Sequence, residues 1–148
     1  MKILAIDTTT KKASVAIKKN DEWFEEVIDN EITHSEKLMP LLDATLKKAG
    51  LKLKDIDLFI TTIGPGSFTG VRIGIATIKA LAKVLNKKII GVTSLELMAL
   101  KLANHTPTPT HILSLMDARN SRVYYNLYEN SNKLTELDFS GNDLLENV

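Results

Sequence analysis

The sequence predicts an α/β protein made of two lobes of similar build. A central unit, residues 57–85, joins a short apolar run rich in Ile and Thr to a glycine turn and a helix. The opening strand and its Asp turn, residues 3–7, return as 112–117, and an internal repeat of this kind implies two related lobes. The second copy stops at Val148 before any comparable helix, so we expect an incomplete second lobe and a chain that continues in nature.

Composition narrows the class of protein. The chain has 148 residues, of which 44% are hydrophobic, enough for a buried core. Its net charge of +1 disfavours an autonomous nucleic-acid binder, and the absence of Cys excludes disulfides and thiolate metal sites. The apolar run at the N-terminus is too short for a signal peptide, and no run approaches membrane-spanning length. We therefore expect a cytoplasmic protein with no membrane partner.

Three short strands are expected first, at 2–6, 13–17 and 23–28, joined by polar turns into an antiparallel meander. The first turn carries Asp7, Thr8 and Thr9. These are the candidates for nucleotide or Mg²⁺ binding, although a hydrogen-bonded turn carboxylate is the favoured interpretation of Asp7.

A helix over 35–49 follows a capping-box pattern, with Thr33 at N-cap and Glu36 at N3, and it ends at Gly50. Pro40 falls inside it. His34 has no second His at helical spacing, which favours a capping or interface role over metal or acid–base chemistry.

The turn Gly64-Pro65-Gly66 allows two interpretations. Amides at a helix N-terminus attract anions, so the turn is a candidate phosphate cradle. The alternative is a tight turn that lets helix and sheet pack closely. No Lys-Ser/Thr pair follows at P-loop spacing and the glycines do not match the dinucleotide fingerprint, so the tight turn is favoured.

The helix after this turn, to about Leu85, is apolar over most of its circumference, which predicts burial on a second side. Gly70 and Gly74 lie one turn apart and are expected to admit another backbone. The second cover is then either a neighbouring helix or a partner protein.

A strand at 88–92 and a helix at 94–103 complete the first lobe in this interpretation. The expected domains are a first lobe at 1–104, a proline-rich linker at 105–110, and the three-strand start of a second lobe at 111–148.

Five stretches together carry a resemblance to a known family. They are Ile3-Leu-Ala-Ile-Asp7-Thr8-Thr9, Ser14-Val-Ala-Ile17, His34-Ser-Glu36, Gly64-Pro-Gly-Ser-Phe-Thr-Gly70-Val-Arg72-Ile-Gly74 and Asp117-Ala118-Arg119. The chain resembles, over its whole length, the TsaB (YeaZ) family of bacterial tRNA threonylcarbamoyladenosine biosynthesis proteins. The resemblance implies the actin-like ATPase and ribonuclease-H-like fold, with a mixed five-stranded sheet and helices in each lobe.

The resemblance also implies a function. The expected role is a non-catalytic subunit that binds and activates its catalytic paralogue TsaD, with the ATPase TsaE completing the assembly. That assembly forms threonylcarbamoyladenosine at position 37 of tRNAs that read A-starting codons. This chain would meet tRNA only through the complex, and ATP or ADP would act at the level of the complex. The alternative is a nucleotide-dependent phosphotransferase or a peptidase of the same fold.

The metal of TsaD is held by two His four residues apart, and Ser94 and Met98 stand at the corresponding positions here. A hydroxyl and a thioether suit that class of cation poorly, so no metal and no catalytic residue are expected in this chain. We expect TsaD, or a second copy of this chain, to pack on the helices at 35–49 and 70–85. The predicted interface consists of His34, Glu36, Leu38, Leu42, Gly70, Ile73, Gly74, Thr77 and Leu81.

Overall fold

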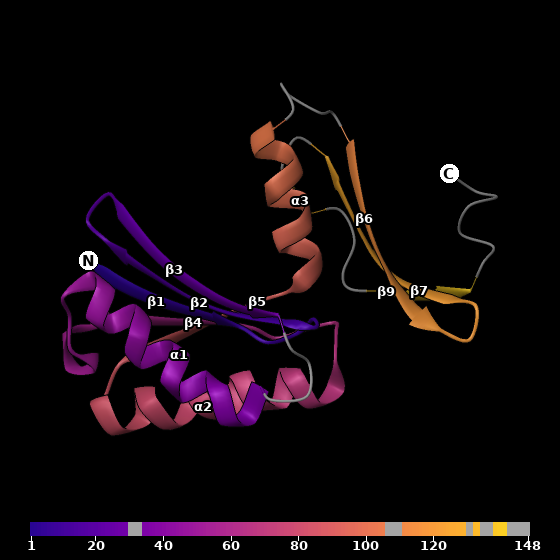
Figure 1. The fold of residues 1–148 in the computed structure, drawn as a ribbon. Coiled ribbons are helices and arrows are strands. Elements are labelled where there is room, and N and C mark those ends of the chain that lie inside the picture. Colours follow the sequence, from indigo (N-terminus) through magenta and orange to yellow (C-terminus); the bar gives the residue numbers. More distant parts are fainter. Residues whose placement is uncertain (30–33, 106–110, 130–131, 134–137, 142–148) are drawn as a thin grey trace. The chain divides into compact units, whose positions relative to one another are not determined.

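The computed structural model describes residues 1–29, 34–105, 111–129, 132–133 and 138–141 (Figure 1). The chain divides into two compact units, Met1–Val92 and Thr93–Val148. The first contains β1 (Lys2–Asp7), β2 (Lys12–Lys19), β3 (Glu22–Asp29), α1 (His34–Ala49), the 3-10 turn η2 (Leu53–Asp55), β4 (Leu58–Thr62), α2 (Phe68–Leu85) and β5 (Lys88–Val92).

The first unit is a five-stranded mixed sheet in the order β3-β2-β1-β4-β5. β1, β2 and β3 pair antiparallel as the predicted meander, while β1, β4 and β5 run parallel. The parallel pairs need crossover connections, which α1 with η2 and then α2 provide. The α/β class and the mixed five-stranded sheet predicted for the first lobe are confirmed.

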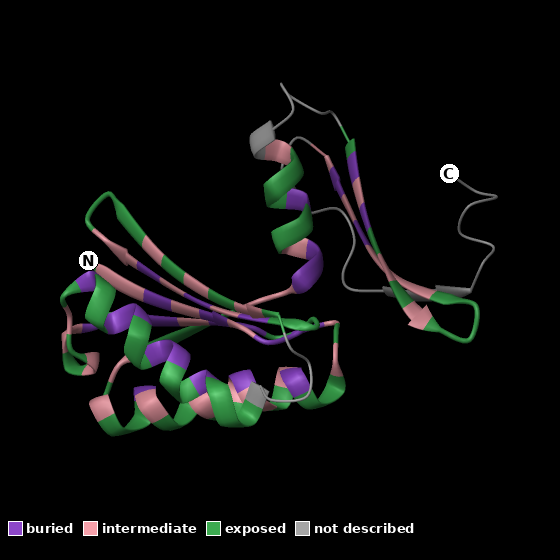
Figure 2. Cartoon of the chain, in the orientation of Figure 1, coloured by how far each residue is buried: buried purple, intermediate pink, exposed green. Residues whose placement is uncertain are grey.

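Both helices of the first unit pack on one face of this sheet, side by side, as Figure 1 shows. The strands alternate, so that every second side chain points to the helices, and Leu4, Val15 and Phe59 are fully buried there. Leu46 of α1 and Ile78 of α2 join the same core. Figure 2 shows the consequence along both helices, where buried residues face the sheet and exposed residues face outward.

The second unit repeats the opening of the first. β6 (His111–Arg119) pairs antiparallel with β7 (Arg122–Glu129), as β1 does with β2. The short strands β8 (Asn132–Lys133) and β9 (Asp138–Gly141) both pair with β7, at its end and its start respectively. The expected third strand of this lobe is therefore two short strands on one edge.

The helix α3 (Ser94–His105) corrects the predicted domain boundary. It packs on β6 and β7 through a small core of Ala99, Ile112 and Tyr128, with Ala103 beside it, and it belongs to the second unit. The boundary lies after Val92, not at the linker predicted at 105–110, of which 106–110 fall outside the described residues.

The capping box expected at Thr33 also falls outside them. No helix in the described part of the chain is long and apolar enough to span a membrane.

Candidate functional site

The glycine-rich stretch before and within α2 packs against the turn between β1 and β2. A Cβ added to Gly70 would lie 1.9 Å from the carbonyl oxygen of Thr8, and one added to Gly66 would lie 2.5 Å from that of Thr9. Gly74 is next in line, with a virtual Cβ 2.6 Å from Thr8 Oγ1. The glycines bring helix and sheet within distances that no side chain permits, which confirms the close-packing interpretation of this turn.

Hydrogen bonds fasten this contact. Thr8 Oγ1 donates to the carbonyl of Gly70 at 2.7 Å, and the amide of Ser67 donates to the carbonyl of Thr9, also at 2.7 Å. Ser67 then caps α2, because its Oγ accepts from the amide of Gly70 at 3.3 Å and its carbonyl from the amide of Val71 at 2.8 Å. Amides that a phosphate cradle would offer to a ligand are thus already engaged.

The candidate nucleotide residues form a closed turn. Asp7 Oδ1 accepts from the amide of Thr9 at 2.9 Å and from its hydroxyl at 2.7 Å, while the Thr8 and Thr9 side chains are buried. This is the local hydrogen-bonded arrangement that Asp adopts in turns. The second unit repeats it, with Asp117 Oδ1 accepting from the amide of Arg119 at 2.7 Å. The repeat seen in the sequence therefore extends to single hydrogen bonds.

The structure corrects part of the predicted partner interface. Leu38 and Leu42 are buried in the core of the first unit, and Gly70 and Gly74 face the turn that carries Thr8. They are committed inside the chain, because the apolar face of α1 and the glycine face of α2 are the faces that pack on the sheet. The His34 side chain lies outside the described residues.

The remaining predicted residues are accessible. Glu36 is exposed, and Ile73, Thr77 and Leu81 are partly exposed on the outer side of α2. Around them lie residues that the sequence did not single out, namely Phe68 (70% exposed), Val84 (85%), and the exposed Ala76 and Ala80. We call Ile73, Ala76, Thr77, Ala80 and Val84 the α2 stripe, since the spacing of three, four and seven residues places them along one line of the helix.

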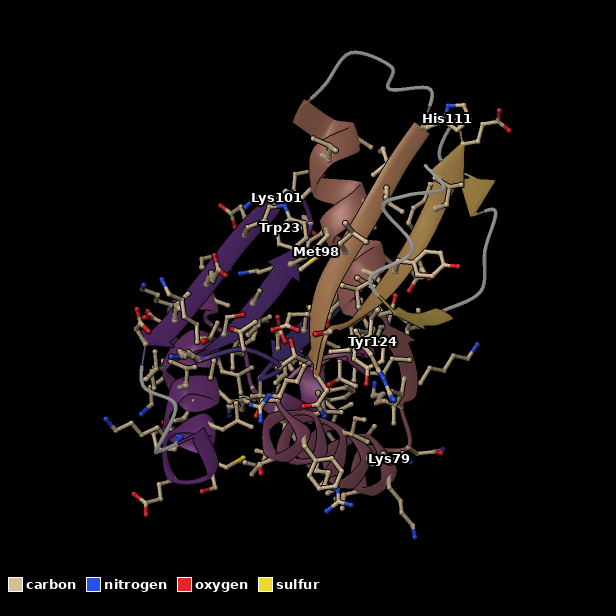
Figure 3. The ribbon with its side chains drawn as sticks, turned by 90° about the vertical axis from the view of Figure 1, so that its right-hand side faces the viewer. Trp23, Lys79, Met98, Lys101, His111 and Tyr124 are labelled. Atoms are coloured by element: carbon tan, nitrogen blue, oxygen red, sulfur yellow. The ribbon has the colours of Figure 1, made fainter. Side chains whose placement is uncertain are left out.

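Two cationic residues border the α2 stripe. The Arg72 guanidinium lies 3.8 Å from the centre of the Phe68 ring, a cation–π contact at the start of the helix. Lys79 projects from α2 into solvent (Figure 3). Sequence reasoning missed the small residues of the stripe, although the four-residue spacing of Ala76 and Ala80 was a usable signal.

The candidate metal positions lie on α3. Ser94 is buried at its first residue, and Met98, four residues on, is 43% exposed. Among the described residues no three His, Cys, Asp or Glu side chains come together in a group that could hold a metal ion.

Comparison with known proteins places the chain among tRNA-modification proteins. The family model described as TsaD, tRNA N6-adenosine threonylcarbamoyltransferase, matches residues 27–144. The tRNA threonylcarbamoyladenosine biosynthesis protein TsaB of Bacillus subtilis is 36% identical over 137 residues, which are 92% of this chain and 58% of that protein. TsaB of Escherichia coli is 36% identical over 134 residues, covering 87% of this chain and 55% of its own length.

A solved structure agrees with these matches. YeaZ from Pseudomonas aeruginosa superposes with a TM-score of 0.85 at 26% identity, over 97% of this chain and 68% of that chain. The chain spans between half and three fifths of the length of these curated relatives.

Proposed function

This chain belongs to the TsaD family, in which its curated relatives are named TsaB, and we propose that it is a subunit of the machinery that forms N6-threonylcarbamoyladenosine in tRNA. The modified nucleoside is adenosine 37 of tRNAs that read A-starting codons. The observation that carries the proposal is the 36% identity to TsaB over 92% of the chain.

We assign the chain a supporting role rather than the transfer chemistry. Asp7 uses one carboxylate oxygen within its own turn, and the amides of Ser67, Gly70 and Val71 have partners within the chain. Ser94 and Met98 offer a hydroxyl and a thioether where the resemblance expects paired His. These features support a non-catalytic subunit that holds neither metal nor nucleotide by itself.

The partner in this proposal is TsaD, and the contact is the α2 stripe. The stripe offers partly exposed Ile73 beside small side chains, and exposed Met39 of α1 lies on the neighbouring helix. Small residues one turn apart let a second helix approach, and the apolar side chains around them supply area worth about 25 cal/mol per Å² when buried. A second copy of this chain would use the same surface, and TsaE would join through the complex.

Depletion in cells tests the function. Loss of this protein should lower threonylcarbamoyladenosine in tRNAs that read A-starting codons and leave unrelated modifications unchanged, measured by mass spectrometry of digested bulk tRNA. An unchanged level would refute the proposed function.

A charge placed on the stripe tests the interface. Ala76→Arg should leave the far-ultraviolet circular dichroism unchanged, because Ala76 is exposed. It should weaken binding to TsaD at least tenfold, which is about 1.4 kcal/mol, since the charge would be buried unpaired against the partner.

Val27→Arg, at an exposed apolar position of β3, is the matched control and should bind normally. Light scattering after size exclusion, with and without TsaD, separates the heterodimer from a homodimer. Normal TsaD binding by a folded Ala76→Arg protein would place the interface elsewhere.

A further inference from the structure

Lysines gather at the end of the first unit where α1 and α2 finish and the parallel strands begin. Two chain segments carry them, 47–58 and 83–88. The register of the sheet aligns these segments, since Leu58 at the start of β4 pairs with Ile3 of β1 and with Lys88 of β5. In Figure 1 this is the end at which the N-terminus lies. We call the group the basic rim, and its members are Lys47, Lys48, Lys52, Lys54, Lys83, Lys87 and Lys88.

The near-neutral total charge of the chain conceals this asymmetry. The two segments hold seven of the 19 Lys and Arg residues but only two of the 18 Asp and Glu residues. They carry a net charge of +5, and the remaining residues together carry −4. A single-sign patch of this kind sets up a local field that total charge does not describe.

The two carboxylates inside the rim are engaged with backbone amides. Asp55 Oδ2 accepts from the amide of Lys52 at 2.9 Å, and Asp57 Oδ2 from the amide of Lys2 at 2.7 Å. That backbone bond, together with the nearby Lys87 charge, lowers the pKa of Asp57 below its ordinary value.

Two lysines at the edge of the rim have acidic partners. Lys47 pairs with Asp43 at 2.6 Å, and Lys48 pairs with Glu26. Within the residues that the structure describes, Lys52, Lys54, Lys83 and Lys88 have no ion pair.

Helix stabilisation explains only part of this arrangement. Cations favour the last turn of a helix, which accounts for Lys47 and Lys48 of α1 and for Lys83 of α2. Lys52, Lys54, Lys87 and Lys88 lie outside the α-helices, so the macrodipole gives no reason for them. Their gathering in one place calls for an anionic ligand.

We propose that the basic rim is a contact surface for the sugar-phosphate backbone of RNA and that the RNA is tRNA. The RNA assignment comes from the charge of the rim, while the choice of tRNA rests on the proposed function. The rim contains Lys and no Arg. Lys ammonium groups bind phosphates as point charges, whereas sequence reading usually relies on bidentate Arg. The rim therefore positions RNA without selecting its sequence, and it acts alongside the RNA contacts of the partner.

Binding of an unmodified tRNA transcript by fluorescence anisotropy tests the proposal. The variant Lys54→Gln/Lys83→Gln/Lys88→Gln removes three rim charges that have no ion pair. The control, Lys37→Gln/Lys79→Gln/Lys101→Gln, removes three exposed lysines outside the rim. Each phosphate contact contributes about 0.7–0.9 to the slope of log K against log salt, or roughly fivefold to eightfold in affinity between 1 M and 0.1 M salt.

The rim variant should therefore bind at least tenfold more weakly at 0.1 M salt, with a slope smaller by about 2, and the control variant should bind like the wild type. Equal losses in both variants would overturn the rim as the contact surface. Binding of phosphatidylglycerol vesicles or of polyglutamate as tightly as tRNA, with the same loss in the rim variant, would overturn RNA as the ligand.

Complementation distinguishes this proposal from the function itself. If depletion lowers the modified nucleoside but the rim variant binds tRNA normally, the rim fails and the function stands. If depletion leaves the nucleoside unchanged while the rim variant loses RNA binding, the surface stands and the proposed function fails.

Discussion

Alanine at Gly70 should destabilise the first unit, although Ala is favoured over Gly in a helix by about 1 kcal/mol. The added Cβ would lie 1.9 Å from the carbonyl oxygen of Thr8 and 3.0 Å from its carbonyl carbon. A backbone group cannot rotate away, so either α2 or the β1–β2 turn must shift and lose the 2.7 Å bond from Thr8 Oγ1 to Gly70. Overpacking costs about 1–3 kcal/mol and the hydrogen bond about 1 kcal/mol, which leaves a net loss of roughly 1–3 kcal/mol.

Gly74 offers a matched case with a different obstacle. Its Cβ would meet the side-chain oxygen of Thr8 at 2.6 Å, not the backbone. Thr8→Ala should therefore relieve Gly74→Ala, so that the double variant is more stable than the two single effects added together. The same Thr8→Ala should not relieve Gly70→Ala, because the clashing carbonyl remains.

Urea unfolding provides the assay. Trp23 is the single tryptophan and lies on β3, so its fluorescence reports the first unit, with circular dichroism as a second probe. Ala80→Gly, at an exposed position of α2, should cost about 1 kcal/mol and shows that the assay resolves such changes. A Gly70→Ala protein as stable as the wild type at unchanged m-value, or an additive Thr8/Gly74 cycle, would refute the close approach of α2 to this turn.

Single contacts and the candidate metal positions support three more predictions. Ser67→Ala removes the cap of α2 and should cost about 1 kcal/mol in urea unfolding, while Thr69→Ala in the same first turn should cost less. The Asp57 pKa is lowered chiefly by the Lys2 amide, so its stabilisation is complete above the ordinary pKa of 3.8 and disappears as the pH falls through the lowered folded value. Asp57→Asn should flatten stability against pH on that acid side, and an unchanged acid limb would contradict this. The purified chain should carry no stoichiometric Zn or Fe by elemental analysis and should not hydrolyse ATP alone; one tightly bound metal or partner-free turnover would contradict the non-catalytic role.

Local patterns in the sequence were sufficient for the first unit because its elements have clear periodicity and punctuation. Alternation predicted the meander, and Gly64 with Pro65 predicted the turn before α2. The Asp7 and Asp117 turns were also predictable, since Asp in a polar turn hydrogen-bonds to the amide two residues on.

Faces of helices and the assignment of α3 were less predictable. An all-round apolar helix does not say which side a glycine faces, and in the structure Gly70 and Gly74 face Thr8. The helix Ser94–His105 follows β5 directly in the chain, so sequence order suggested the first lobe, whereas its packing on Ile112 and Tyr128 depends on contacts distant in sequence. The basic rim was missed because its lysines come from separate segments, which only the register of β1, β4 and β5 brings together.

The two copies of the Asp turn show how one local solution came to serve different ends. In the first unit the residues after Asp7 are buried threonines, and they receive the glycines of α2. In the second unit Arg119, Asn120 and Ser121 have positive φ and are exposed. Each Asp makes the same hydrogen bond to the amide two residues on, so the two turns diverge only in the residues that come after the Asp. The first turn has become a rigid seat for α2, which fixes the α2 stripe relative to the sheet. A partner that binds the stripe therefore meets a preorganised surface and loses little conformational entropy in forming the contact.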